Sequence, residues 1–259
     1  GKTPPCTDAI IQSRMICRVV VGVKDPNPNV SGRGLKKLRA AGIRVDVGVL
    51  EDECQELIET FAKWILTQWP FVLLKSAITL DGALAMRRGV RSDFSGPESM
   101  KRVMELRQIY DAIAVGANTV AIDNPRLTTR GVRRSRSPVR VIFDTGLRIS
   151  YRAQLLKEAG RTIIFTGPNV TEKKVRAVCA ASSGVAVIPC PVKDGAVSLG
   201  AALSWLGQYD ITSLMVEGGG TLASAFLAEG LVDKMIIHIA PFFAKSLNAP
   251  KLFQKNFSH

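Results

Sequence analysis

The stretch Val216-Glu217-Gly218-Gly219-Gly220-Thr221-Leu222-Ala223 places a glycine turn between an apolar run, 211–216, and a helix-like segment, 222–229. Glycine lets backbone amides approach a phosphate closely, and the N-terminus of the following helix favours an anion. The pattern predicts a nucleotide-phosphate cradle, although such turns also serve simple strand-to-helix connections. Glu217 stands at the lip of the turn, beside the expected reacting end of the nucleotide.

Length and composition bound the kind of protein. A chain of 259 residues with 46% hydrophobic content can form one large or two modest domains. No apolar run approaches the roughly 18 to 20 residues of a membrane span, and no signal peptide is visible. Five cysteines without paired spacing fit a reducing compartment. We expect a cytoplasmic protein with no membrane partner, and the start at Gly1 suggests a fragment or a processed chain.

The formal net charge of +13 fits nucleic acid, acidic lipid or a phosphorylated small molecule. No aromatic residues interleave with the arginines of the basic stretch, and no helix-turn-helix or RNA-binding signature is present, so nucleic acid is disfavoured. A solvated surface is the other interpretation of the same charge. Much of the excess lies in a stretch that looks like a loop: Arg126, Arg130, Arg133, Arg134, Arg136 and Arg140.

Apolar β-rich runs alternate with helix-like segments, which predicts an α/β fold. Strands are expected at 18–23 and 43–49 with helices at 34–41 and 51–66, and Pro70 marks a boundary. Residues 131–138 are expected to form a mobile loop. The later strands are expected at 71–78, 111–116, 139–144, 162–166, 185–188, 214–216 and 234–240, and the later helices at 97–108, 172–181, 201–207 and 222–229.

The N-terminal hexapeptide Gly1-Lys2-Thr3-Pro4-Pro5-Cys6, followed by Asp25-Pro26-Asn27-Pro28, resembles the end of a zinc deaminase domain. The family is that of the bifunctional riboflavin-biosynthesis deaminase/reductase. By this resemblance Cys6 is the last zinc ligand, but the other ligands and the general acid/base glutamate are absent from this chain. We therefore expect an orphaned or buried thiol at Cys6, zinc only in an intact parent domain, and no deamination by this chain.

The remainder of the chain resembles the reductase half of the same family. The resemblance implies a dihydrofolate-reductase-like α/β domain, with a largely parallel sheet, over 70–259, preceded by the C-terminal remnant of a cytidine-deaminase-like domain over 1–69. The family pattern continues with further strands beyond the expected strand 234–240. Four motifs carry the resemblance in order: Lys75-Ser76-Ala77-Ile78-Thr79-Leu80-Asp81-Gly82, Leu106-Arg107 with Asp111-Ala112-Ile113, the segment 118–130, and the glycine turn with Leu231-Val232-Asp233.

The resemblance implies NADPH-dependent reduction of the ribosyl group of 5-amino-6-(5-phosphoribosylamino)uracil to a ribityl chain. The sugar ring opens to an imine or aldehyde-like carbon, which accepts hydride from the nicotinamide, so the protein mainly supplies positioning and charge. A bifunctional parent would also deaminate the preceding pyrimidine. The expected partner is a phosphorylated pyrimidine, and a homo-oligomer is expected. The arginine-rich surface favours NADPH over NADH.

The resemblance also implies roles for particular residues. Lys75 and Glu217 are the expected catalytic residues beside the reacting sugar. The substrate would be held by Arg91, Arg107, Leu127, Arg130 and Glu217. The cofactor would be held by Ala77, Asp93, Thr119, Asp123, Thr145, Gly219, Gly220, Thr221, Leu222, Ala223, Ser224 and Ala225.

Several of these residues have a simpler interpretation. Lys75 lies in an apolar strand and needs a partner, which Glu217 or the substrate hydroxyls could supply. Asp123 could cap the turn at Asn124-Pro125, and Thr145 is a natural turn residue. His238 is expected to be a packed or surface histidine and not a catalyst.

Two departures from the family pattern leave other functions open. Arg91 and Asp93 stand where the family has serine and tryptophan; an arginine can reach a phosphate, whereas Asp93 would repel one. An absent edge strand would expose backbone donors and apolar surface. A catalytically silent NADP-binding pseudoenzyme and a polyanion-binding protein therefore remain as alternatives.

Overall fold

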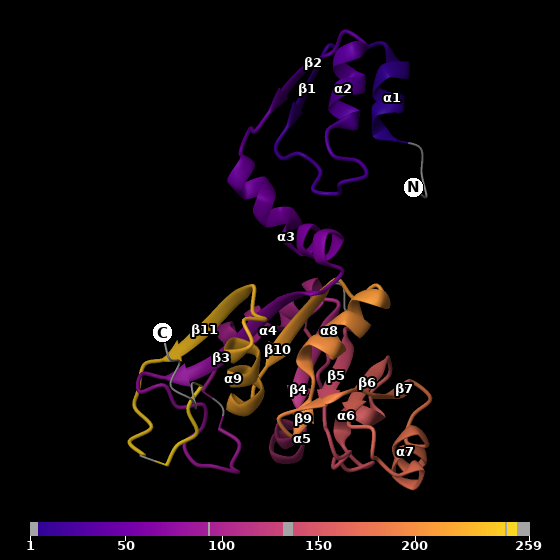
Figure 1. The fold of residues 1–259 in the computed structure, drawn as a ribbon. Coiled ribbons are helices and arrows are strands. Elements are labelled where there is room, and N and C mark those ends of the chain that lie inside the picture. Colours follow the sequence, from indigo (N-terminus) through magenta and orange to yellow (C-terminus); the bar gives the residue numbers. More distant parts are fainter. Residues whose placement is uncertain (1–4, 93, 132–136, 247, 253–259) are drawn as a thin grey trace. The chain divides into compact units, whose positions relative to one another are not determined.

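The computed structural model describes residues 5–92, 94–131, 137–246 and 248–252, and the chain divides into two compact units, Gly1–Trp69 and Pro70–His259. The division falls at Pro70, where the sequence places a boundary. Each unit has its own sheet, drawn in Figure 1. Among the described residues, no helix is both long enough and apolar enough to cross a membrane.

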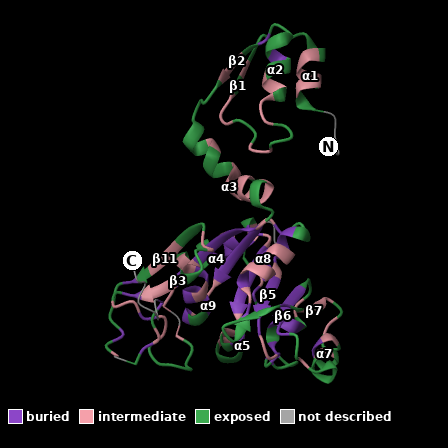
Figure 2. Cartoon of the chain, viewed as in Figure 1, coloured by how far each residue is buried: buried purple, intermediate pink, exposed green. Residues whose placement is uncertain are grey.

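The first unit does not enclose a core of its own. Its sheet is one parallel pair, and of its described residues only Leu38 and Ile43 are buried, as Figure 2 shows by the near absence of purple. A domain needs a larger buried apolar surface to be stable alone. Its elements are α1 (Cys6–Ser13), β1 (Arg18–Val21), α2 (Arg33–Ala40), β2 (Arg44–Val47) and α3 (Glu51–Thr67).

The second unit is built on a seven-stranded sheet in which every neighbouring pair is parallel. The strand order is β11-β3-β10-β4-β5-β6-β7, so β11 and β7 form the edges (Figure 1). The apolar runs predicted as strands between residues 71 and 240 all form strands of this sheet. Their bounds are β3 (Phe71–Thr79), β4 (Ala112–Gly116), β5 (Val139–Phe143), β6 (Thr162–Thr166), β7 (Val185–Pro189), β10 (Ser213–Glu217) and β11 (Lys234–Ala240).

Helices cover both faces of this sheet. On one face Leu73 and Met215 pack with Leu106 of α4 (Pro97–Ile109) and with Tyr110, which follows that helix. On the other face the aromatic residues of β5 and β6 contact rings of the last two helices, with centroids 5.6 to 5.9 Å apart. The other elements are α5 (Ala117–Asp123), α6 (Gln154–Lys157), α7 (Glu172–Cys179), α8 (Leu199–Gln208) and α9 (Gly220–Ala228), with a hairpin of β8 (Val192–Lys193) and β9 (Ala196–Val197).

The order of the strands decides where a ligand can bind. The chain passes from β3 through α4 to β4, and it later returns through α8 to place β10 between these two strands. In open parallel sheets, ligands bind outside the carboxyl ends of the strands where the strand order changes direction. The carboxyl ends of β3, β10 and β4 are therefore the expected place for a site.

One prediction about the basic stretch is wrong. Arg140 was counted with the loop-like basic stretch and its solvated surface, but it lies in β5, within the predicted strand 139–144, and its side chain is buried. Its guanidinium donates to Thr162 Oγ1 at 2.9 Å and to the carbonyls of residues 158–160 at 2.9 to 3.0 Å. Burial lowers the pKa of Arg140. This arginine therefore stabilises the β5–β6 connection instead of binding a ligand.

The rest of the basic stretch divides in two. Arg126 pairs with Glu158, and Arg130 is exposed. Arg133, Arg134 and Arg136, with most of the predicted loop 131–138, lie outside the described residues.

Candidate active site at the glycine turn

Lys75, in the middle of β3, lies beside Glu217, which is at the carboxyl end of the neighbouring parallel strand β10. Glu217, the last residue of β10, is in register with Lys75 of β3. Residues in register on paired strands project from the same face of a sheet. This is the face covered by α4, which contributes Arg107.

Arg107 and Glu217 form a buried, bidentate ion pair. Arg107 Nε donates to Glu217 Oε1 at 2.8 Å and NH2 donates to Oε2 at 2.7 Å, with side chains only 10% and 13% exposed. A third donor, NH1, reaches the carbonyl of Thr128 at 2.9 Å. Burial acts to lower the pKa of Arg107, but the charge and hydrogen bonds of Glu217 outweigh it and raise that pKa. Two residues predicted separately as substrate ligands thus form one unit.

Lys75 is a half-buried cation beside this ion pair. Burial lowers the pKa of Lys75; the carboxylate of Glu217 opposes that change, and the guanidinium of Arg107 adds to it. Charge-assisted hydrogen bonds already tie Glu217 to Arg107, so its attraction for Lys75 is purely one of charge. An ammonium with a lowered pKa releases its proton more readily, which suits a proton donor.

The lowered pKa of Lys75 has a consequence for stability. Between the folded-state pKa and the ordinary value of about 10.4, the unfolded chain binds more protons, so stability rises with pH in that window. Below the window the cost of burying the charge is fully present. We expect Lys75→Met to stabilise the protein at neutral pH by about 1 kcal/mol and to flatten this rise. Urea unfolding at several pH values measures both effects, and an unchanged slope would show that Lys75 is not buried as a cation.

The glycine turn after β10 has the geometry of a phosphate cradle. Gly218 and Gly219 have φ of 72° and 66°, a region that favours glycine, and α9 begins at Gly220 without a side-chain cap. A Cβ on Gly219 would lie 2.7 Å from Thr119 Oγ1, so Thr119 of α5 closes one side of the turn. Uncapped amides at the start of a nine-residue helix fit a nucleotide diphosphate.

The other predicted cofactor residues divide by burial. Ala77 lies two residues after Lys75 and so on the same face of β3, and Thr221 is exposed at the start of α9. Leu222 and Ala223 are buried, and Ser224 Oγ donates to the carbonyl of residue 252 at 2.9 Å, so these three serve the packing of α9. Gly220 and Ala225 lie in the same helix.

Thr145 and Asp123 follow β5 and end α5, respectively. The hydroxyl of Thr145 accepts a hydrogen bond from Val197 N at 3.1 Å, which ties it to the β8–β9 hairpin. Asp123 lies in the segment that follows the carboxyl end of β4, and Thr145 in the segment that follows the carboxyl end of β5. Their roles toward a cofactor stay predictions.

The other predicted substrate ligands differ in their surroundings from the buried pair of Arg107 and Glu217. Arg130 and Arg91 are both exposed. Leu127 is 2% exposed with φ of 52° and belongs to the apolar core, so its side chain serves packing. Asp93 lies outside the described residues.

The sequence did not single out His238 as a site residue. His238 of β11 is in register with Ala77, so it projects on the face that carries Lys75. Its Nδ1 is buried without a hydrogen-bond partner among the described residues. Burial lowers the pKa of His238, and the charges of Lys75 and Arg102 add to this effect. The sequence of 234–240 gives no signal for this placement, because apolar residues occupy both faces of the strand.

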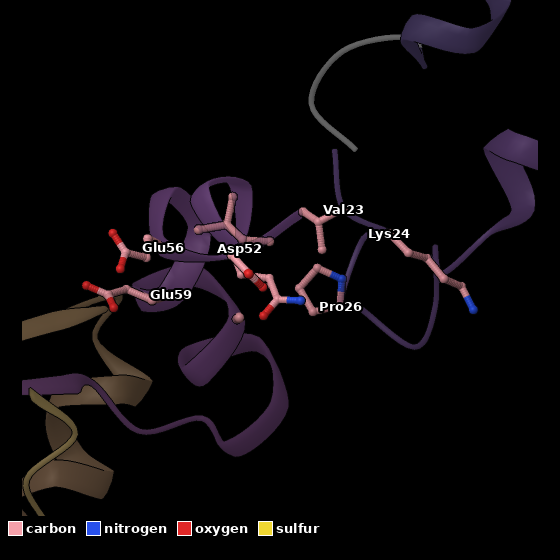
Figure 3. A pocket seen from close by; sticks show the side chains of 9 residues that line it. Val23, Lys24, Pro26, Asp52, Glu56 and Glu59 are labelled. Atoms are coloured by element: carbon pink, nitrogen blue, oxygen red, sulfur yellow. The ribbon is translucent and has the colours of Figure 1, made fainter. Parts of the chain in front are cut away.

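The described part of the first unit, residues 5–69, contains no metal site. Cys6 is exposed at the start of α1, and the described residues contain no group of three or more His, Cys, Asp or Glu side chains arranged to hold a metal ion. A hollow of about 580 Å³ lies between the segment after β1 and α3 (Figure 3). Its lining combines Lys24 and Pro26 with three carboxylates, those of Asp52, Glu56 and Glu59.

Comparison with known proteins identifies the family of this arrangement. Residues 70–258 match the family described as the RibD C-terminal domain. The chain belongs to the RibD C-terminal domain family. The riboflavin biosynthesis protein RibD of Aquifex aeolicus is 43% identical over 243 residues, which cover 93% of this chain and 65% of that protein. The chain therefore spans less than two thirds of that relative.

Solved RibD structures match the whole chain. Acinetobacter baumannii RibD superposes with a TM-score of 0.85 at 32% identity. The match covers 100% of this chain and 70% of the Acinetobacter baumannii chain. The diaminohydroxyphosphoribosylaminopyrimidine deaminase/5-amino-6-(5-phosphoribosylamino)uracil reductase of Thermotoga maritima superposes with a TM-score of 0.83 at 36% identity, covering 100% and 68%. The α/β fold of the dihydrofolate reductase type, predicted for residues 70–259, is thereby confirmed.

Proposed function

We propose that residues 70–259 reduce the ribosyl group of 5-amino-6-(5-phosphoribosylamino)uracil to a ribityl chain with NADPH, a step of riboflavin biosynthesis. Family membership supports the reaction class. One observation carries the proposal: the glycine turn directly follows Glu217 in the chain. Glu217 is paired with Arg107 and in register with Lys75. A nucleotide on that turn would present its reactive end to these charged groups.

Each residue of the site has a proposed task. The amides after Gly219 would hold the cofactor diphosphate, and the bound nicotinamide would supply the hydride. Lys75, with its lowered pKa, would give a proton to the ring oxygen of the sugar as the ring opens to the imine. Glu217 would accept hydrogen bonds from the ribose hydroxyls while Arg107 fixes its orientation. Arg130, exposed, would meet the substrate phosphate.

The experiment is to mix the 259-residue chain with NADPH and the phosphoribosylaminouracil. We expect one NADPH to be oxidised for each ribityl product formed, and no oxidation when the pyrimidine is left out. Binding of NADPH without oxidation would instead favour the silent NADP-binding protein. Tight, salt-dependent binding of a generic oligonucleotide would favour the polyanion binder. The burial of Arg140 argues against that alternative, because this arginine is not available to bind an anion.

We propose that residues 1–69 are the C-terminal part of a cytidine-deaminase-like domain, whose zinc belongs to the intact domain. Two observations support this: of the unit's described residues only Leu38 and Ile43 are buried, and a RibD structure covers the unit completely. The Thermotoga maritima protein carries both activities in its name. A cytoplasmic location and a homo-oligomeric state are part of the same proposal.

A further inference from the structure

The turn after β5 holds an arginine in a fixed place at the carboxyl edge of the sheet. The buried carboxylate of Asp144 accepts hydrogen bonds from Arg148 N at 2.5 Å and Ile149 N at 2.8 Å. Leu147 N donates to the Asp144 carbonyl at 3.0 Å, and Leu147 takes the left-handed φ of 48°. A non-glycine residue in this conformation costs free energy and persists only where its surroundings impose it. The backbone from which the Arg148 side chain starts is therefore rigid.

This turn carries a net positive charge that solvent can reach. Arg148 Nε lies 3.6 Å from Asp144 Oδ1, and NH2 donates to Asn118 Oδ1 at 3.4 Å, yet the side chain is 65% exposed. A second cation, Lys174 of α7, donates to the carbonyl of Gly146 in the same turn at 3.1 Å. The turn thus holds two cations and one carboxylate, that of Asp144. The Arg148 guanidinium is positioned by Asp144 and Asn118, and its remaining N–H donors can bind an anion.

A dinucleotide bound at the glycine turn would place its adenosine half near Arg148 and Lys174. The reacting groups, Lys75 and Glu217, lie on β3 and β10, whereas β4 and β5 lie on the other side of the glycine turn. A Cβ on Gly219 would collide with Thr119 at the start of α5, and the preceding residue, Asn118, accepts a hydrogen bond from Arg148. With its nicotinamide toward Lys75 and its diphosphate on the turn, a dinucleotide must extend its adenosine half over β4 and β5.

We propose that Arg148, assisted by Lys174, binds the 2′-phosphate of the adenosine ribose and thereby selects NADPH over NADH. A guanidinium forms bidentate, charge-assisted hydrogen bonds with a phosphate, and an ammonium contributes as a point charge. NADH lacks this phosphate and gains nothing from either cation. The inference rests on the proposed function in one respect, because it takes the diphosphate to lie on the glycine turn.

The test is the affinity of the full 259-residue chain for each nucleotide, read from nicotinamide fluorescence. We expect Arg148→Gln to weaken NADPH binding about tenfold and to leave NADH binding unchanged. Lys174→Gln should weaken NADPH binding about threefold, since its ammonium is exposed. Competition by 2′,5′-ADP should weaken in parallel with NADPH, and the NADPH preference should fall as salt is added.

Matched controls come from the same two segments. Arg152, whose guanidinium lies 5.5 Å from the centre of the Tyr151 ring, and Lys173 carry the same charges but are not bonded to the turn. Arg152→Gln and Lys173→Gln should leave the ratio of the two affinities unchanged. Equal effects of the control and test variants would show that only net charge matters and would overturn the inference.

The outcomes separate this inference from the reductase proposal. An Arg148→Gln protein that keeps the wild-type ratio of affinities, or that loses both nucleotides equally, overturns the inference and leaves the reductase standing. A wild-type chain that prefers NADPH but does not oxidise it with the pyrimidine present overturns the reductase alone. A wild-type chain that binds neither nucleotide overturns both.

Discussion

Glu217→Gln is expected to slow hydride transfer roughly ten- to a hundredfold, the effect of losing one charge-assisted contact beside the reacting carbon. NADPH affinity should be preserved, because the glycine turn that follows is unchanged. Single-turnover oxidation of NADPH and a separate binding titration measure the two quantities. Loss of cofactor affinity with an unchanged rate would place the carboxylate in the nucleotide site.

The same substitution is expected to destabilise the protein. Arg107 would remain buried with a neutral amide in place of its charged partner, and breaking a buried ion pair on one side costs about 3 kcal/mol. Rates must therefore be compared at a temperature where denaturation curves show the variant to be folded. The matched control is Glu229→Gln at the end of α9, where the carboxylate is 3.7 Å from Lys193 and more exposed. It should change neither the rate nor the stability appreciably.

The strands that hold this site could be predicted because local composition decides them. The apolar runs of β3 and β10 are long, β-rich and bounded by turn residues, and both were predicted to within two residues. The short helices α5 and α6, with seven and four residues, were missed because they contain too few residues to show a helical period. The β8–β9 hairpin was missed because each strand has only two residues.

The contacts of the site could not be derived from local patterns. Arg107 and Glu217 are 110 residues apart, and they meet only because α8 returns the chain to place β10 between β3 and β4. Their roles came from a family resemblance, which named the residues but not their pairing. The burial of Arg140 was not predicted for a related reason, since the carbonyls of residues 158–160 that accept its hydrogen bonds belong to a connection with no sequence signal.

Gly219→Val is expected to weaken NADPH binding by roughly a hundredfold or more, because two effects act at the phosphate cradle. The backbone at Gly219 has φ of 66°, which a β-branched residue strongly disfavours. The new Cβ would also lie 2.7 Å from Thr119 Oγ1, so either α5 or the turn must shift. Both effects displace the amides at the start of α9 that would bind the diphosphate.

Gly230 provides the matched control for this prediction. It has nearly the same φ, 65°, but a Cβ there would meet nothing within 4 Å. Gly230→Val should therefore lose stability from backbone strain alone, about 1 to 3 kcal/mol, and keep its NADPH affinity. Comparing the two variants removes the strain common to both and leaves the contact with Thr119. If both lost affinity equally, the loss would reflect destabilisation, and the glycine turn would not be the phosphate cradle. If only Gly219→Val lost it, nucleotide binding would depend on the close approach of the turn to α5.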